Sequence, residues 1–326
     1  MNTLRRMSLL ACTLGLLATA MPASAQGTYP DHTVKLLVAL PAGGGVDIIA
    51  RLVGQKLAAT TGQPFVVDNR AGASGQIGVP AVAKAAPDGY TLMVSPASFL
   101  TTNKSIFKTL PYNPETDFTP ITKLVNQPMV LVVRDKSRFA TPADVLAAAK
   151  ANPGKLTYAS SGDGSPQHLA GLMFTNRTGV EMLHVPYKGG APAITDLMGG
   201  VVDMAFSPLP EALPHIKAGK LHPVGILADK RASTAPDIPT LKEGGVNNVV
   251  LSAWIGLLAP AKTPQPVIDK LNQSVKTMLQ SPDMKAKLQE AGMESAVDEA
   301  KPLQQVISEE IKIHAELVKA AGLVPQ

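Results

Sequence analysis

The stretch LLVALPAGGGVDIIAR, residues Leu36–Arg51, joins three signals that together decide the fold. An apolar run predicts a buried strand over Val34–Leu40, and three consecutive glycines predict a tight loop over Pro41–Gly45. Apolar residues then return at helical spacing, which predicts a helix over Val46–Thr60. The first N–H groups of such a helix lack partners within the helix and favour a negatively charged ligand. The stretch therefore predicts a strand, a loop and a helix that together present an anion site.

The same order of signals occurs a second time, later in the chain. Strand Leu156–Ala159 leads through the polar loop Ser160–Ser165 into a helix over Pro166–Arg177. In both places a Thr-Gly pair ends the helix, and a strand, a second helix and a third strand follow. Each copy predicts a β-α-β-α-β unit, and right-handed crossovers make its sheet parallel and covered by helices. The expected fold class is α/β, with two doubly wound lobes of related design.

The rest of the chain sets the expected lobe boundaries. A turn-rich passage over Tyr112–Pro120 is followed by a strand over Met129–Val133 and a helix opened by the capping box Thr141-Pro142-Ala143-Asp144. A strand over Val249–Leu258 is expected to return the chain to the first lobe, and three helices follow it. The predicted lobes are residues 26–126 with 249–326, and residues 127–248.

The first 25 residues have the pattern of a bacterial secretory signal peptide. Arg5 and Arg6 precede the apolar run Leu9–Ala20, and Ala23-Ser24-Ala25 offers a cleavage site. Cys12 precedes most of the apolar run, which argues against lipoprotein acylation. Cleavage removes the single cysteine and lowers the net charge from +5 to about +3. We therefore expect an exported chain without disulfides, and no nucleic-acid surface, because basic runs are absent and aromatic residues few.

The glycine loop does not match either nucleotide fingerprint. Ile48 stands where the dinucleotide motif needs its third glycine, and Gly45-Val46-Asp47 differs from the end of a phosphate loop. Asp47, in the first helical turn, is expected to accept backbone N–H groups. Neither loop contains lysine or arginine, which favours a carboxylate over a phosphate. Because ligands of open α/β sheets lie beyond the carboxyl ends of the strands, two such loops are expected to face one small carboxylate across a cleft.

Other polar residues near these loops are candidates for the cleft wall. His168 could contact the ligand or bond the loop backbone, and Lys188 could meet a second carboxylate or remain in solvent. His184, on an apolar strand, is expected to be a core residue. Catalytic and metal-binding motifs are absent from the sequence, and we expect no cofactor. The wall candidates are Ser95, Ser98, Tyr187, Lys188 and Ser207.

Short motifs in a fixed order carry a family resemblance. They are Pro41-Ala42-Gly43-Gly44 with Asp47, Asp68-Asn69-Arg70, Gly72-Ala73 with Gly75, Asp88-Gly89-Tyr90, Asp117-Phe118-Thr119-Pro120, Ser161-Gly162-Asp163-Gly164-Ser165 with His168, and Val185-Pro186-Tyr187-Lys188-Gly189. With them the chain resembles, over its whole mature length, the periplasmic receptors of tripartite tricarboxylate transporters, also called the Bordetella uptake gene family.

The resemblance implies a type II periplasmic-binding-protein architecture whose two lobes close on a ligand. It also implies that the ligand carboxylate is held by backbone amides, hydroxyls and ordered water. Carried over by position, the nominated residues are Ala42, Gly43, Gly44, Asp47, Ser160, Ser161, Gly162, Gly164, Ser165 and His168. Leu40 departs from the family, where an aromatic residue often stands, so the wall beside the first loop has its own shape.

The leading hypothesis is a monomeric, non-catalytic receptor in the periplasm that delivers a small organic carboxylate to a membrane permease. One rival is a periplasmic hydrolase or isomerase, which would need a nucleophile–base pair in the cleft. A second rival is a receptor that presents its closed form to a signalling kinase. Dicarboxylates, tricarboxylates, acidic amino acids and aromatic acids remain open as ligands.

Overall fold

The computed structural model describes residues 29–134, 136, 138–297, 301–320, 322–323 and 325. The predicted signal peptide, residues 1–25, lies outside the described residues. The helices and strands belong to one compact unit, His32–Gln326.

The first predicted unit is present with parallel strands in the order β2-β1-β3. Four of the five residues of β1 are apolar and buried, as expected for a strand covered on both faces, and the fifth, Lys35, is exposed. Helix α2 ends at Gly62, whose left-handed backbone donates to Ala58. The elements are β1 (Val34–Val38), α2 (Gly45–Thr61), β2 (Phe65–Asn69), η1 (Ala73–Gly75), α3 (Gly78–Ala83) and β3 (Thr91–Pro96).

The second predicted unit repeats the first, with parallel strands in the order β6-β5-β7. Its first helix, α7, has Ser165 as N-cap, Pro166 at the first helical position and Gly179 as C-cap. The elements are β5 (Thr157–Ser160), α7 (Pro166–Thr178), β6 (Leu183–Pro186), α8 (Gly190–Gly199) and β7 (Met204–Pro208). Both units thus place a glycine-containing loop beyond the carboxyl end of their central strand.

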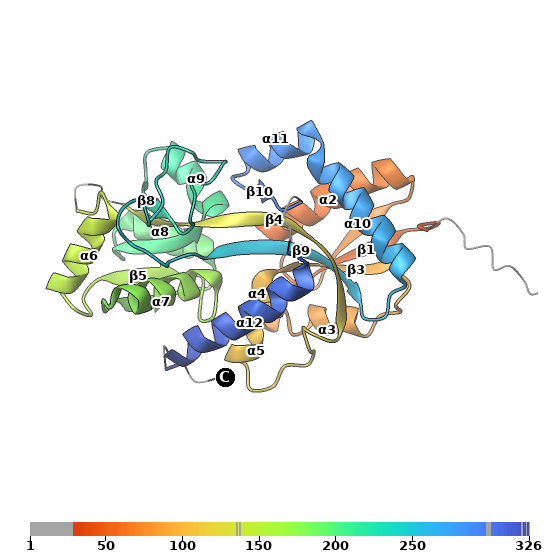
Figure 1. Cartoon of the computed structure of the whole chain (residues 1–326), viewed down its shortest axis with the longest axis horizontal. Coiled ribbons are helices and arrows are strands. Elements are labelled where there is room, and N and C mark those ends of the chain that lie inside the picture. Colours follow the sequence, from red (N-terminus) through yellow and green to blue (C-terminus); the bar gives the residue numbers. More distant parts are fainter. Residues whose placement is uncertain are drawn as a thin grey trace, which may run out of the picture. The chain divides into compact units, whose positions relative to one another are not determined.

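Two antiparallel strands, β4 (Phe118–Val133) and β9 (Ser252–Pro260), join the two units into one sheet. They pair with each other, and β9 pairs with β3 of the first unit. The last residues of β4 pair with β7 of the second unit and with β8 (His222–Ile226). In Figure 1, β4 and β9 run side by side between the two groups of helices and strands.

The length of β4 corrects the sequence expectation, which ended a turn-rich passage at Pro120 and began the strand only at Met129. Pro120 and Pro128 both lie inside the observed strand. The pairing with β9 shifts register after Pro120 and again after Lys123. Such irregularities let a strand contain residues that cannot donate to the ladder.

The remaining helices cover the sheet. The predicted capping box of α6 is confirmed, because Thr141 accepts from the Asp144 N–H and the Asp144 carboxylate accepts from the Thr141 N–H. Helix α12 supplies residues to two hydrophobic clusters, Val306 and Ile307 to the one built on the first unit and Leu317 to the one built on the second. These elements are α4 (Ala97–Thr101), α5 (Asn103–Ile106), α6 (Pro142–Ala151), α9 (Leu209–Lys217), α10 (Gln265–Gln280), α11 (Pro282–Glu290), β10 (Glu294–Ser295) and α12 (Leu303–Ala320).

Candidate functional site

The first loop exposes its backbone at the start of α2. Residues 41–45 are all exposed, and Gly43 has φ +87°, a conformation that glycine adopts without strain. An added Cβ at Gly43 would meet no atom within 4 Å, so the loop is open on that side. Within the described part of the chain, the N–H groups of Gly44 and Gly45 donate to no protein atom. They are free for a ligand.

Asp47 holds this loop from beneath and does not face outward. Its carboxylate is 2% exposed and accepts from Gly43 N at 2.9 Å, Arg51 Nε at 2.9 Å and Asn69 Nδ2 at 3.0 Å. The Arg51 hydrogen bond, helped by those of Gly43 and Asn69, lowers the pKa of Asp47 to about 2. Asn69 Nδ2 also donates to the Leu40 carbonyl at 3.2 Å. The structure confirms the expectation that Asp47 accepts a backbone N–H, here that of Gly43, and its nomination as a ligand-binding residue stays a prediction.

The second loop is built in the same way with different side chains. Gly162 and Gly164 have φ +124° and +71°, and the Ser165 hydroxyl accepts the His168 N–H at 3.2 Å. His168 Nδ1 accepts the Gly164 N–H at 3.1 Å, and the ring is 2% exposed. Of the two alternatives for His168, the structure shows the bond to the loop backbone. Gly164 is buried, and an added Cβ would lie 2.5 Å from Ile106 Cδ1.

Beneath this loop, His168 and His184 stack face to face. Their ring centroids lie 3.8 Å apart with an interplanar angle of 8°. Burial, together with the neighbouring His184, lowers the pKa of His168 to about 4, and burial also lowers the pKa of His184. Both rings are therefore neutral near pH 7.

These two histidines and Asp163 bring three possible metal-ligand atoms within 4.8 Å of one another. The geometry fits a metal ion poorly. Lone pairs of parallel stacked rings do not converge on one point, and the Gly164 N–H already occupies His168 Nδ1. The observed contacts of the two histidines are with loop residues: His168 bonds the Gly164 N–H, and His184 bonds the Ser160 hydroxyl.

Ser160, His184 and Asp163 also resemble a catalytic triad. In such a triad Ser160 would be the nucleophile, His184 the base and Asp163 the acid that orients the base. Ser160 Oγ lies 2.6 Å from His184 Nε2, but His184 Nδ1 is 3.6 Å from Asp163, beyond hydrogen-bonding distance. The Ser160 side chain is buried at 1% exposure, and its oxygen bonds both the N–H and the carbonyl of Gly162. Its hydroxyl is engaged by Gly162 and His184 and shapes the loop, and the nomination of Ser160 as a ligand-binding residue stays a prediction.

The predicted wall residues behave in corresponding ways in the two units. Ser95 and Ser207 stand one residue before the ends of β3 and β7, are 1% and 2% exposed, and donate to the carbonyl of the following proline. Tyr187 donates its hydroxyl to Asp196 at 2.8 Å, and burial raises its pKa to about 12. Lys188 is exposed and Ser98 half-buried. Of these wall residues, Ser207 lines one small hollow together with Ser160 and Ser161.

Residues 49–323 match the family described as "Tripartite tricarboxylate transporter family receptor". The chain belongs to this receptor family. It is similar to three solved structures: R. palustris Rpa4515 with adipate (35% identity, TM-score 0.82, covering 91% of this chain and 100% of that one); the periplasmic binding protein BugD (36%, 0.78, 91% and 100%); and MatC (Rpa3494) from Rhodopseudomonas palustris with bound malate (32%, 0.77, 89% and 100%).

Membership of the receptor family confirms two predictions made from the sequence. The fold is that of the two-lobed periplasmic binding proteins, and the family consists of solute receptors rather than enzymes. Among the helices of the described residues, none combines the length and apolar content needed to cross a bilayer.

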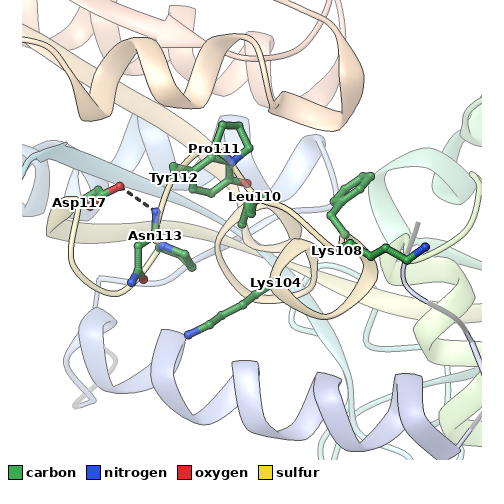
Figure 2. Close-up of a pocket in the computed structure, with 9 residues that line it drawn as sticks. Lys104, Lys108, Leu110, Pro111, Tyr112, Asn113 and Asp117 are labelled. Atoms are coloured by element: carbon green, nitrogen blue, oxygen red, sulfur yellow. Dashed lines mark hydrogen bonds between the residues drawn. The ribbon is translucent and has the colours of Figure 1, made fainter.

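A hollow near the first unit contains none of the predicted site residues. It has a volume of about 490 Å³ and is lined by α5 and the loop that follows it. Figure 2 shows Lys104 and Lys108 pointing away from each other and Asp117 accepting from the Asn113 backbone. Lys104 also pairs with Glu115. Because its polar groups do not converge, this hollow is a poor candidate for a ligand site.

Sequence reasoning missed two residues of the receptor's second loop region. Gln167 accepts the Ser161 hydroxyl at 2.9 Å, and Glu211 lines the same hollow as Ser161. Gln167 stands in the first turn of α7, a position that could have suggested a role. Glu211 lies far from the loop in sequence, and only the approach of α9 to α8 brings it close.

Proposed function

We propose that this receptor works in the periplasm, holds a small organic carboxylate between the loops 41–45 and 160–165, and delivers it to the permease of a tripartite tricarboxylate transporter. The signal peptide 1–25 would direct its export. The lobes that close would be residues 26–126 with 249–326 and residues 127–248. One chain is sufficient for this task.

One observation carries the proposal: both units present the same kind of loop at the same place. In each loop a glycine N–H is turned inward to a side chain four residues later, Gly43 to Asp47 and Gly164 to His168. The N–H groups of Gly44 and Gly45 are not used in this way, because they donate to no protein atom among the described residues. Oriented N–H groups at a helix N-terminus favour an anion.

The charge of the loops favours a carboxylate. Neither loop contains a lysine or an arginine, so binding would depend on N–H and hydroxyl donors, and closure would strengthen these by excluding water. The similar proteins Rpa4515 and MatC were solved with adipate and with malate, which are both carboxylates. This agreement supports the same ligand class here.

A thermal-shift screen of the purified protein tests the proposal. The protein is unfolded and refolded to remove bound ligand, then heated with organic acids and with their matched amides. At about a hundred times its dissociation constant, a ligand should add about 2.7 kcal/mol, which raises the melting temperature by several degrees. A shift with an acid and none with its amide supports the proposal, and no shift with any acid contradicts it.

A matched pair of glycine variants tests the role of the loop. Gly43 and Gly62 have φ +87° and +76°, and an added Cβ at either would meet nothing within 4 Å. Gly43→Val and Gly62→Val should therefore cost similar stability through backbone strain, while only Gly43→Val should lose ligand binding. Equal ligand affinity in the two variants would show that the first loop takes no part in binding.

A further inference from the structure

Glu211 places a carboxylate inside the region where the loops favour a negatively charged ligand. It stands in the first turn of α9, directly after β7. It lines the same small hollow as Ser160, Ser161 and Ser207. An acidic side chain in this place would repel a simple carboxylate, so its partner matters.

The surroundings of Glu211 satisfy only part of its hydrogen-bonding capacity. Gln167 lines the same hollow and favours the ionised form of Glu211 by lowering its pKa, while the amide oxygen of Gln167 accepts the Ser161 hydroxyl at 2.9 Å. Within the ranges that the structure describes, no lysine, arginine or histidine forms an ion pair with Glu211. An ionised carboxylate has about four acceptor positions, so several remain for a ligand.

Gly190 allows Glu211 to reach this place. An added Cβ at Gly190 would lie 2.2 Å from Glu211 Oε2, so the carboxylate rests directly against the N-terminal residue of α8. The helix dipole favours the negative charge there, yet it supplies no full positive charge. Glu211 is exposed as a residue, yet the protein packed around its carboxyl group raises the pKa of that group, so its ionised form would gain from a cationic partner.

We propose that Glu211 is a specificity-determining residue that selects carboxylates bearing an ammonium group, that is, amino acids. The loop donors would hold the ligand carboxylate and Glu211 would pair with its ammonium group. The inference rests on the proposed function, because the ammonium group that would pair with Glu211 belongs to the same ligand whose carboxylate the loops would hold. A carboxylate without an amine would meet the same loops and be repelled by Glu211.

Matched probe pairs that differ only in the amine test this selection. The pairs are aspartate and succinate, glutamate and glutarate, alanine and propionate, and phenylalanine and 3-phenylpropionate. Calorimetry at pH 7.5 is expected to show, for at least one pair, that the wild-type protein binds the amino acid at least about tenfold more tightly. Glu211→Gln should abolish this preference and strengthen binding of the acid without the amine.

Glu316→Gln is the matched control, because it makes the same charge change at an exposed position of α12. It should keep the wild-type preference. In the wild type, the preference should also decline as the pH falls and Glu211 becomes protonated, and the Glu211→Gln variant should lack this decline.

The outcomes separate the inference from the proposed function. If acids bind and the amine makes no difference, or if Glu211→Gln weakens both members of a pair equally, Glu211 only stabilises the start of α8 and the inference is wrong. The proposed function would then stand. If no acid with or without an amine binds the wild-type protein, the proposed function fails, and the inference fails with it.

Discussion

The two loops hold the same backbone geometry with opposite kinds of side chain. In the first loop, Gly43 donates its N–H to the ionised Asp47, which also binds Arg51 and Asn69. In the second loop, Gly164 donates its N–H to the neutral ring of His168. The acceptor comes four residues after the glycine in both loops. The comparison teaches that the position of the acceptor, rather than its charge, is what such a loop requires.

The largest expected effect concerns the packing behind the loops. Ala50 in α2 and Gly171 in α7 stand at the same spacing after Gly43 and Gly164. An added Cβ at Gly171 would lie 2.1 Å from Cε2 of Tyr158, which is 1% exposed. Gly171→Ala should lower the free energy of unfolding by about 3 kcal/mol, because the buried ring cannot move aside. Urea titration measures the change.

A second glycine serves as control for that variant. At Gly199, near the end of α8, an added Cβ would make an ordinary 3.8 Å contact with Val201. Gly199→Ala should keep or slightly raise stability. A Gly171→Ala protein as stable as the wild type would show that the two units pack alike at this position.

The role of charge in the first loop can be tested by two substitutions of Asp47. Asp47→Ala leaves three donors without their acceptor and should cost about 2 kcal/mol of stability. Asp47→Asn keeps one acceptor oxygen and should cost about 1 kcal/mol. Chemical denaturation compares both with the wild type. Equal losses would mean that the charge, and not the acceptor, holds the loop.

The pH dependence of stability should differ between the loops. The pKa of His168 is lowered from 6.5 to about 4, so between these values the unfolded chain binds a proton that the folded chain does not. The stabilisation due to His168 is complete above pH 6.5 and is lost as the pH falls toward 4. The lowered pKa of Asp47, about 2, means that its stabilisation is present above pH 3.8 and is lost only as the pH falls toward 2.

As the pH falls, the second loop is therefore expected to lose its stabilising contribution before the first loop does. Urea titrations at pH 7.5, 5.5 and 4.5 should show that His168→Gln weakens the pH dependence by up to about 1.4 kcal/mol per pH unit. The glutamine oxygen can still accept the Gly164 N–H. The same slope in variant and wild type would assign the pH dependence to other histidines, such as His184 and His314.

The smallest effect is expected at Arg51, for which α7 has Leu172 at the corresponding position. The Arg51 side chain is 54% exposed, so solvent screens its 2.9 Å contact with Asp47. Arg51→Ala should cost less than about 1 kcal/mol, similar to Arg70→Ala at the exposed Arg70–Asp68 pair. A clearly larger loss at Arg51, measured by denaturation at low and high salt, would make the arginine essential to the first loop.

The sequence was sufficient to predict the two repeated units and their loops, because glycines and apolar runs are local signals. The capping box at Thr141 was predicted for the same reason and is confirmed. The extent of β4 was not predicted, because Pro120 and Pro128 suggest an interruption of the strand. Pro120 instead lies next to a register shift, and Pro128 lies where pairing with β9 ends and pairing with β7 begins.

The site was predictable only where its residues adjoin the loops. The stacking of His168 on His184 depends on the pairing of β5 with β6, and the position of Glu211 depends on the packing of α9. Such contacts join residues that are distant in sequence, so no local sequence pattern predicts them. The free backbone groups of the loops also carry no side-chain signal.

Helix α12 has a consequence for how tightly any ligand would be held. Its residues Val306 and Ile307 pack into the cluster of the first unit, while Leu317 and Val318 pack into that of the second. Opening would have to strip Leu317 and Val318 from their contacts or carry the end of the helix along. In the proposed closing motion these two residues would help to set the balance between open and closed populations, and a shift in that balance would change the apparent affinity in proportion. Leu317→Ala should increase the radius of gyration of the unliganded protein, measured by X-ray scattering, and weaken ligand binding. This side chain lies in the core, far from the loops in sequence.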